Sequence, residues 1–254
     1  MNAGPDPLEE LRQRHGFDEW RDSRSTDEAL FIWRFFLAGA ELPDRRPLRI
    51  ENVEAPGLPP AIRSMWAAGN GEPLDAPVFR VDVYEAPSRA EAHEVLLGRL
   101  AQFESPRIER KSAPGDVAFG GPDDHVLLFS RGNIVALLRN AGSEIAPVGP
   151  VARELDLLFT APRQVARDPL RPEILRAEVA VTQPALREPA PLVIEAEDPL
   201  GRPIWFRLAA DGGDFLARAG GVLYTPDTEG RHTIEITAIN ENLGSASRQL
   251  HFET

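Results

Sequence analysis

Cysteine is absent from this 254-residue chain, which excludes disulfide bonds, zinc–thiolate sites, iron–sulfur clusters and cysteine nucleophiles. Lysine occurs once, at Lys111, so nearly all positive charge comes from arginine. The longest early apolar run, at residues 29–40, is interrupted by Arg34 and Gly39 and falls short of the roughly 18 residues that span a bilayer. We therefore expect no direct membrane span.

The start of the chain also lacks the pattern of an export signal. Residues 1–10 contain neither a basic region nor an apolar core. We expect a periplasmic or extracellular protein if a leader was removed, and otherwise a cytoplasmic one. The net charge of −12 disfavours nucleic-acid and anionic-lipid partners, because it repels phosphate groups.

The length of the chain and its proline-rich connecting segment predict two folded units. The hydrophobic fraction of 42% over 254 residues is enough for two cores. We expect a polar N-terminal arm at 1–24, an α+β domain at 25–160, a proline-rich linker at 161–187 and an all-β domain at 188–254. The arm is expected to dock loosely, with a short helix over 8–15.

The α+β domain is predicted from an alternation of helical and strand patterns. Ser25 and Glu28 form a capping box that predicts a helix over 29–40, and Ser88 and Glu91 form a second one. Helices packed on a mostly antiparallel sheet satisfy this order. The other helices are expected from Ser88 to about Phe103 and at 151–159. The strands are expected at 48–53, 78–84, 116–119, 125–130 and 133–139, with helical turns at 61–68 inside a loop.

The last part of the chain has short alternating strands separated by turn residues, a pattern that predicts a β-sandwich. The strands are expected at 192–196, 204–208, 215–217, 222–225, 232–238 and 247–252, and an earlier one can begin at 178–182.

This region resembles a known family. Leu192–Gly201, LVIEAEDPLG, followed by PIWFRL at 203–208, is similar to cadherin-like and bacterial immunoglobulin-like repeats, in which A-x-D-P-x-G-x-P-L-x-Y-x-L forms strand, turn and strand. GGVLYTPDTEGRHTIEITAIN, at Gly220–Asn240, matches their second half. The resemblance implies an immunoglobulin-like sandwich and no specific activity. The hairpin at Gly115–Leu138 resembles one in uncharacterised bacterial exported proteins, which also implies no activity.

Related repeats bind calcium through acidic loops, so the resemblance makes Glu195, Glu197 and Asp198 candidate metal ligands. Asn240-Glu241-Asn242 stands where those repeats carry an aspartate-rich segment, and one domain lacks the neighbour that completes a site between repeats. Calcium needs six to eight converging oxygen atoms. We expect a solvated turn at 195–198 rather than a calcium site, and no cofactor.

No nucleophile elbow, phosphate-binding loop, dinucleotide fingerprint or histidine pair of zinc spacing occurs in the sequence. Asp123-Asp124-His125 is the one compact group of acids and imidazole, and it can hold a metal or perform acid–base chemistry. The alternative is an ordinary turn between strands, where aspartate is common for backbone reasons.

Two further places are candidate contact sites. Arg131 and Asn133 offer donors for a carboxylate or a sugar, although Arg131-Gly132 also fits a hairpin turn. Trp66 lies in the proline-rich segment 54–77, where it either contacts a partner or packs onto the core.

These observations favour a non-catalytic binding or scaffolding protein of the bacterial cell envelope with a protein partner. One alternative is an enzyme or enzyme accessory whose sandwich positions carbohydrate or substrate. Another is a component of a cytoplasmic assembly.

Overall fold

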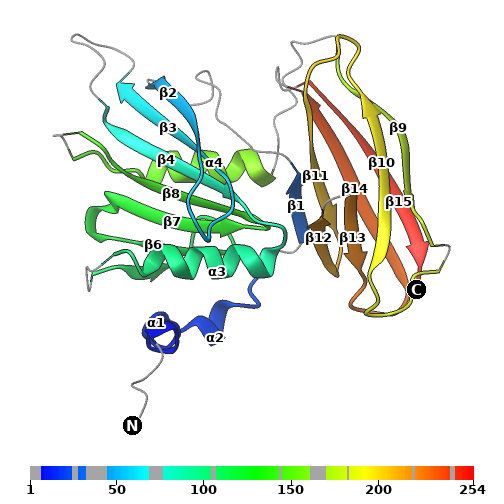
Figure 1. Ribbon diagram of the computed structural model, residues 1–254, viewed down its shortest axis with the longest axis horizontal. Helices are drawn as coiled ribbons and strands as arrows, with labels where there is room; N and C mark the ends of the chain where they lie inside the picture. The colour runs from blue at the N-terminus through cyan, green and yellow to red at the C-terminus, as the bar shows by residue number, and fades with distance from the viewer. Residues whose placement is uncertain are drawn as a thin grey trace.

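The computed structural model describes residues 7–24, 28–32, 45–68, 77–103, 107–142, 145–160, 170–181, 183–218, 221–240 and 244–254. Within these ranges the chain forms fifteen β-strands in three antiparallel sheets, together with four α-helices (Figure 1). The protein is therefore rich in β-structure, with one large sheet at one end and two smaller sheets at the other.

The large sheet has seven strands and a helix on each face. Side chains alternate between the two faces along each strand, so Leu128 packs toward α3 (Arg89–Leu100) and Phe129 toward α4 (Gly149–Thr160). Each face of the sheet thus has its own apolar core. In sheet order the strands are β2 (Arg45–Val53), β3 (Ala61–Ala68), β4 (Phe79–Glu85), β8 (Ile134–Asn140), β7 (Val126–Arg131), β6 (Val117–Gly120) and β5 (Glu109–Lys111).

The helix predicted after Ser88 is confirmed. Ser88 caps α3, because its hydroxyl oxygen accepts a hydrogen bond from the Glu91 amide at 3.2 Å. The buried stripe of α3 contains Ala92, Leu96 and Leu100, as the helical spacing predicts. The predicted helix before residue 160 is confirmed as α4.

The N-terminal segment packs firmly on the α3 side of the large sheet. It contains α1 (Pro7–His15) and α2 (Phe17–Trp20), and the aromatic side chains of α2 are buried. Trp20 Nε1 donates to the His15 carbonyl at 2.8 Å, and His93 Nδ1 on α3 lies 2.6 Å from the Arg21 carbonyl. The helix at 8–15 is confirmed, but the expectation of a loosely docked arm is wrong for residues 7–24.

The two smaller sheets have four strands each and pack face to face. Leu208 and Ile234 from one sheet share a core with Phe215 and Tyr224 from the other, which gives a sandwich-like architecture. The strands at 190–253 agree with those predicted from the sequence. One sheet has the order β1 (Glu28–Ile32), β11 (Ile204–Ala210), β14 (Arg231–Asn240), β15 (Ser245–Glu253), and the other β12 (Asp214–Arg218), β13 (Gly221–Thr225), β10 (Ala190–Glu197), β9 (Glu173–Val179).

A strand replaces the first part of the helix predicted at 29–40. β1 pairs in register with Phe206–Ala210 of β11, and Leu30 enters the core of the sandwich. Its short apolar run fits a strand as well as a helix, and pairing with β11 supplies the hydrogen bonds that decide between them. The remainder, residues 33–40, lies outside the described residues.

Residues 61–68 also form a strand, β3, instead of the expected helical turns. Ile62, Ser64 and Trp66 lie on the same face of the strand and are buried, and the strand pairs with β2 and β4 on either side. Pairing with β2 over 61–68 and with β4 over 61–66 provides backbone partners that an isolated helical turn lacks.

The predicted linker contributes a strand to the sandwich. β9 pairs with β10 from Glu173 to Val179, so this strand begins earlier than the segment 178–182 in which we expected it. Residues 161–169 and 182 lie outside the described residues.

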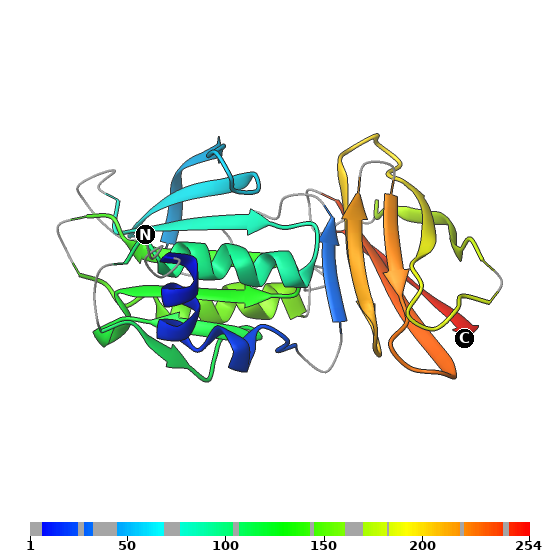
Figure 2. The same ribbon diagram turned by 60° about the horizontal axis from the view of Figure 1, so that its bottom comes forward.

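The turn between β7 and β8 joins the large sheet to the sandwich. The side chain of Asn133 donates to the Phe31 carbonyl at 2.8 Å and accepts from the Phe31 amide at 2.6 Å. Gly132 lies so close to β1 that a Cβ atom there would come within 2.1 Å of the Ala29 carbonyl oxygen. The rings of Phe31 and Phe159 meet at 5.4 Å, so apolar packing also crosses the junction, where Figure 2 shows β1 beside the large sheet.

Candidate functional site

Asp123, Asp124 and His125 lie in a tight turn after β6, and they do not converge. Both aspartates have positive φ angles, 56° and 51°. Asp124 Oδ1 is 3.7 Å from Lys111 Nζ, and Asp123 is exposed. No hydrogen bond links the three side chains, and no group of three metal-ligating side chains occurs in the part of the chain that the structure describes. The turn interpretation therefore fits better than an acid–base or metal site.

Arg131 and Asn133 are turned inward rather than offered to a ligand. Arg131 donates to Asp156 Oδ1 at 2.7 Å and to Asp116 Oδ1 at 2.8 Å. Burial lowers the pKa of Arg131, but the hydrogen bonds to Asp156 and the charge of Asp116 more than offset it and hold the pKa above its ordinary value. Asn133 is fully buried at the junction. Neither residue is an exposed donor.

Trp66 is a core residue and not a surface contact. Its side chain has no exposed area, its ring stacks on Phe79 with centroids 6.1 Å apart, and its Nε1 donates to Ser64 Oγ at 2.8 Å. The interpretation in which Trp66 packs on the core is the one that the structure supports.

The three acidic residues proposed as calcium ligands do not form a site. Asp198 is buried, and its carboxylate accepts from Arg202 Nε at 2.8 Å and from Asn240 Nδ2 at 2.9 Å. The Arg202 hydrogen bonds, with help from Asn240, hold the pKa of Asp198 well below its usual range. Glu195 pairs instead with Arg176 at 3.3 Å. The expectation of a solvated turn is thus wrong for Asp198, since nitrogen donors surround a buried carboxylate. Glu197 is exposed.

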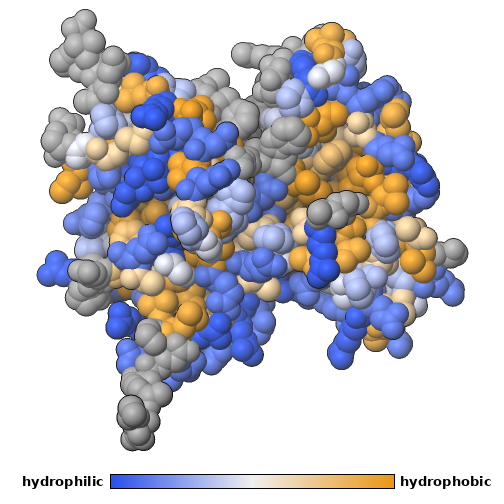
Figure 3. Space-filling model, viewed as in Figure 1, coloured by the Kyte–Doolittle hydropathy of each residue, from blue (hydrophilic) through white to orange (hydrophobic). Residues whose placement is uncertain are grey.

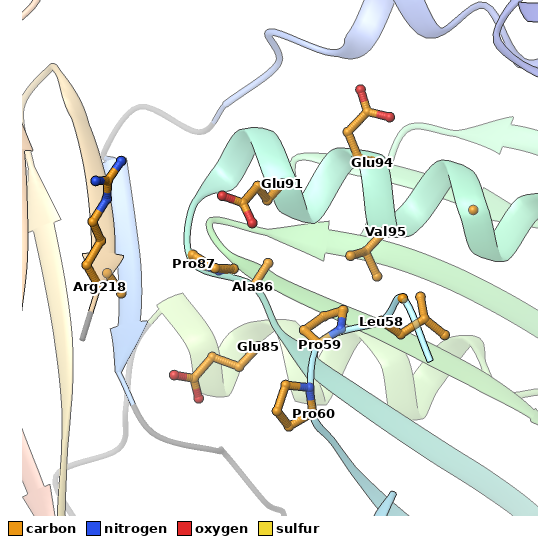
Figure 4. A pocket seen from close by; sticks show the side chains of 13 residues that line it. Leu58, Pro59, Pro60, Glu85, Ala86, Pro87, Glu91, Glu94, Val95 and Arg218 are labelled. Atoms are coloured by element: carbon orange, nitrogen blue, oxygen red, sulfur yellow. The ribbon is translucent and has the colours of Figure 1, made fainter. Parts of the chain in front are cut away.

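A hollow among the described residues lies where the large sheet meets the sandwich. We call it the junction cleft, and its volume is about 670 Å³, within the usual range for ligand sites. Three parts of the chain form it, as Figure 4 shows: the loop between β2 and β3, the end of β4 with helix α3, and strand β12. The lining residues are Gly57–Pro60, Glu85–Pro87, Glu91, Glu94, Val95, Gly98, Ala217 and Arg218.

Carboxylates dominate the polar lining of the junction cleft. Glu91 and Glu94 project from α3 and Glu85 from the end of β4, while Arg218 lies across the cleft on β12. The remaining walls are apolar and carry prolines, which hold their backbone rigidly. The cleft can therefore attract a cation and pack against an apolar surface at the same time.

The walls of the junction cleft are fixed to one another. The Ala217 amide of β12 donates to the Pro87 carbonyl at 2.8 Å, which ties the sandwich to the β4–α3 connection. Arg89 Nη2 donates to Asp214 Oδ1 at 2.9 Å beside it. Glu94 is anchored by Arg12 of the N-terminal helix at 2.8 Å. The cleft is thus held open before any ligand binds.

A second hollow, of about 640 Å³, opens into the sandwich itself. Ile32, Phe206 and Ile194 line it, and Arg218 borders both hollows. Apolar side chains gather on the sandwich face in Figure 3. Arg218 is the one polar side chain among the described residues that line this groove, so the groove has few groups with which to select a ligand.

The sequence offered little signal for the junction cleft. Glu91 was recognised as part of a capping box, while Glu94 and Arg218 look like ordinary solvated charges. Pro59-Pro60 marks a loop but does not reveal what faces it. These residues come together only because β1 brings the sandwich against the large sheet.

Comparison of the chain with protein-family models, with curated proteins and with solved structures finds no match. Among the described residues, no helix is both long and apolar enough to cross a membrane.

Proposed function

We propose that the protein is a non-catalytic binding or scaffolding protein of the bacterial cell envelope, and that it holds a basic, extended segment of a partner protein in the junction cleft. The observation that carries this proposal is the cleft itself, a hollow of about 670 Å³ whose walls come from both the large sheet and the sandwich. Clefts between packed units are frequent binding sites in proteins.

The lining of the cleft supports the choice of partner. Glu94 is paired with Arg12, but Glu85 and Glu91 still outnumber the single Arg218, so a segment with Lys or Arg side chains is electrostatically complementary. An extended segment also suits the place, because β12 is an edge strand of its sheet and borders the cleft. The surface of a globular domain would contact only the rim of the junction cleft.

The fixed junction supports binding in a second way. Asn133 and the packing of Phe31 on Phe159 hold the two parts of the molecule together without a ligand. A site that is already formed loses little conformational entropy when a partner binds. The fixed junction therefore suits binding in a preformed cleft better than a mechanism in which the two parts close around the ligand.

The proposal extends to the fold class of each part of the molecule and to the cellular location of the protein. We propose that the large sheet with its helices is an α+β domain and that the paired smaller sheets are an immunoglobulin-like domain. The resemblance of Leu192–Gly201 and Gly220–Asn240 to such repeats supports the second part. Periplasmic or extracellular placement follows from the frequency of such domains in exported proteins, with a cytoplasmic assembly as the alternative.

A peptide-display selection on the complete chain tests the proposal. We expect enriched peptides to be rich in Lys and Arg and to lose binding when the cleft is filled by Gly98→Trp. A Cβ at Gly98 would meet no atom within 4 Å, and replacing a helical glycine favours the helix, so this variant should fold. Ala101→Trp places the same side chain at an exposed position outside the cleft and should bind normally.

The charge is tested separately with Glu91→Gln and the matched variant Glu109→Gln, which changes an exposed carboxylate on β5. Binding should weaken for the first and not for the second. Peptides without basic residues, or peptides that bind Gly98→Trp as tightly as the unchanged chain, would overturn the proposal.

A further inference from the structure

Three arginines lie in a row across the α3 face of the large sheet. Arg80 on β4 lies directly opposite Arg139 on β8. Arg63 on β3 lies opposite Asp82, two residues further along β4 on the same face. Asp82 accepts from Arg63 Nε at 2.7 Å and lies 2.9 Å from Arg80 Nη2, and Glu51 on β2 lies opposite Arg63 in the register. The positive charge therefore gathers at the end of the row away from Glu51, where Arg80 lies opposite Arg139.

Arg80 and Arg139 form a like-charge pair across the strands. They are directly opposite in the register of β4 and β8, which places their Cβ atoms about 5 Å apart. Burial lowers the pKa of Arg80, Asp82 opposes this, and the charges of Arg139 and Arg63 lower it further. Asp82 is already engaged by two arginines, and the structure gives Arg139 no ion-pair partner within the described residues. A bound anion would relieve this repulsion.

A small hollow lies beside Arg139. Its volume is about 210 Å³, roughly the space that seven water molecules occupy in the liquid. Its polar wall carries Arg139 and His125, and its apolar wall carries Phe103, Ile108 and Val126. Asn140 also borders it, but the side-chain amide of Asn140 is used within the fold, where it donates to the His125 and Ala146 carbonyls.

We propose that this hollow binds a carboxylate group carried on a short apolar chain, with Arg139 and the imidazole of His125 as the groups that receive it. The guanidinium fork of arginine matches the two oxygens of a carboxylate. The apolar wall selects a ligand with a few carbon atoms next to that group. The site lies on residues other than those of the junction cleft, so it does not rest on the proposed function.

The carboxylate can come from a free short-chain acid or from the C-terminus of a peptide, and the test separates the two. The probes are butyrate, a short peptide ending in valine with a free carboxylate, and the same peptide ending in an amide. Binding is followed on the complete chain by the amide and imidazole NMR signals of Val126 and His125, with sodium chloride as the ionic-strength reference.

We expect butyrate or the peptide acid to shift these signals and the peptide amide to leave them unchanged. Arg139→Gln should weaken binding by about tenfold or more, because it removes the charge-assisted contact. Arg110→Gln is the matched control, because Arg110 is an exposed arginine on β5 that does not line the hollow. It should change affinity by less than about twofold, since distant exposed charges are screened.

The outcomes decide the proposal. Binding of butyrate alone assigns a free acid, and binding of the peptide acid assigns a C-terminus. Equal loss in Arg139→Gln and Arg110→Gln would show that only the general surface charge attracts the anion, and the proposal would fail. It would also fail if the amide bound as well as the acid, or if none of the three probes moved the signals.

Discussion

Asn133 completes the backbone hydrogen bonding of Phe31, a residue 102 positions earlier in the chain. The side-chain amide takes the role of a neighbouring strand, because it donates to the Phe31 carbonyl at 2.8 Å and accepts from the Phe31 amide at 2.6 Å. Its second N–H donates to the Ala86 carbonyl at 2.8 Å. One side chain therefore closes the outer edge of β1 and links it to the end of β4.

Replacement of Asn133 by Leu should destabilise the whole molecule. The substitution keeps a similar volume but leaves the Phe31 amide and the carbonyls of Phe31 and Ala86 buried without this partner, at a cost of about 2–4 kcal/mol. Urea unfolding measures the loss. Gln249→Leu, at an exposed position of β15, is the control and should change the free energy of unfolding by less than about 0.5 kcal/mol. Equal stability of the two variants would show that the contact does not hold β1.

Alanine substitutions at Gly132 and Gly57 distinguish the effect of steric contact from that of backbone strain. Both have positive φ angles, 54° and 75°, so alanine is strained at either position by about 1–2 kcal/mol. A Cβ at Gly57 meets nothing within 4 Å, whereas one at Gly132 would lie 2.1 Å from the Ala29 carbonyl oxygen. Gly132→Ala should therefore cost more than Gly57→Ala, by about 1–3 kcal/mol, because β1 must shift.

Thermal unfolding of the two variants gives the comparison, and hydrogen exchange at β1 locates the effect. Faster exchange of the Phe31 amide is expected in Gly132→Ala alone. A similar loss of stability in both variants would mean that β1 does not approach the turn as closely as the structure shows.

Local patterns predicted the elements whose neighbours are close in sequence. The Ser88 cap and the stripe of Leu96 and Leu100 depend on contacts over a few residues, and the structure contains both. The hairpin expected at Arg131-Gly132 is also present, but its loop is Gly132-Asn133, because Arg131 pairs with Ile134. The pairs β12–β13 and β14–β15 follow the same logic, since each joins strands across a turn that the sequence marks, whereas β11 pairs with the distant strands β1 and β14.

The elements that were missed depend on distant partners. Residues 28–32 have a short apolar pattern that both helix and strand accommodate, and pairing with β11 decides the outcome. Asn133 looked like a surface donor for the same reason, because the strand that covers it comes from elsewhere in the chain. No local sequence pattern predicts the junction cleft, since Glu91 and Arg218 line the same hollow only in the folded molecule.

Arg202→Met should be among the more damaging single changes in the sandwich. It keeps a long apolar side chain but removes the guanidinium that faces the buried Asp198 carboxylate, and a buried charge without its partner is costly. We expect the unfolding temperature to fall by several degrees. Arg231→Met changes an exposed arginine of β14 and should leave it nearly unchanged. Similar unfolding temperatures would show that the pair has no stabilising role.

Calcium should not stabilise the protein through this turn. Asp198 already receives hydrogen bonds from Arg202 and Asn240, and a cation placed there would be repelled by the guanidinium. The measurement is the unfolding temperature in calcium chloride, in magnesium chloride and with a chelator. A rise in calcium that disappears in the Asp198→Asn variant would contradict this prediction.

His93 should make the docking of the N-terminal segment sensitive to acid. Its ring is fully buried 5.6 Å from that of Trp20, and burial lowers its pKa from the ordinary value of 6.5. The Arg21 carbonyl and the charges of Asp116 and Asp22 oppose this shift, while Arg89 adds to it.

Proton placement explains why the charged ring is disfavoured. A carbonyl only accepts hydrogen bonds, so the proton of the neutral ring lies on Nδ1, facing Arg21. A second proton would go to Nε2, which is buried without a hydrogen-bond partner. The unfolded chain therefore takes up this proton more readily than the folded one.

The sign of the pH effect follows from this difference. The contribution of His93 to stability is complete above its unfolded pKa of about 6.5 and is lost as pH falls from there toward the lower folded pKa. Hydrogen exchange of residues 7–24, measured as pH decreases, should show the segment opening in that window. His93→Leu should reduce this dependence on pH, and the remainder is due to His15 of α1, whose pKa is also lowered by burial and by the charge of Arg14. His251→Gln, at an exposed position of β15, should retain the dependence in full. A segment that opens equally in both variants would place the pH-sensitive group elsewhere.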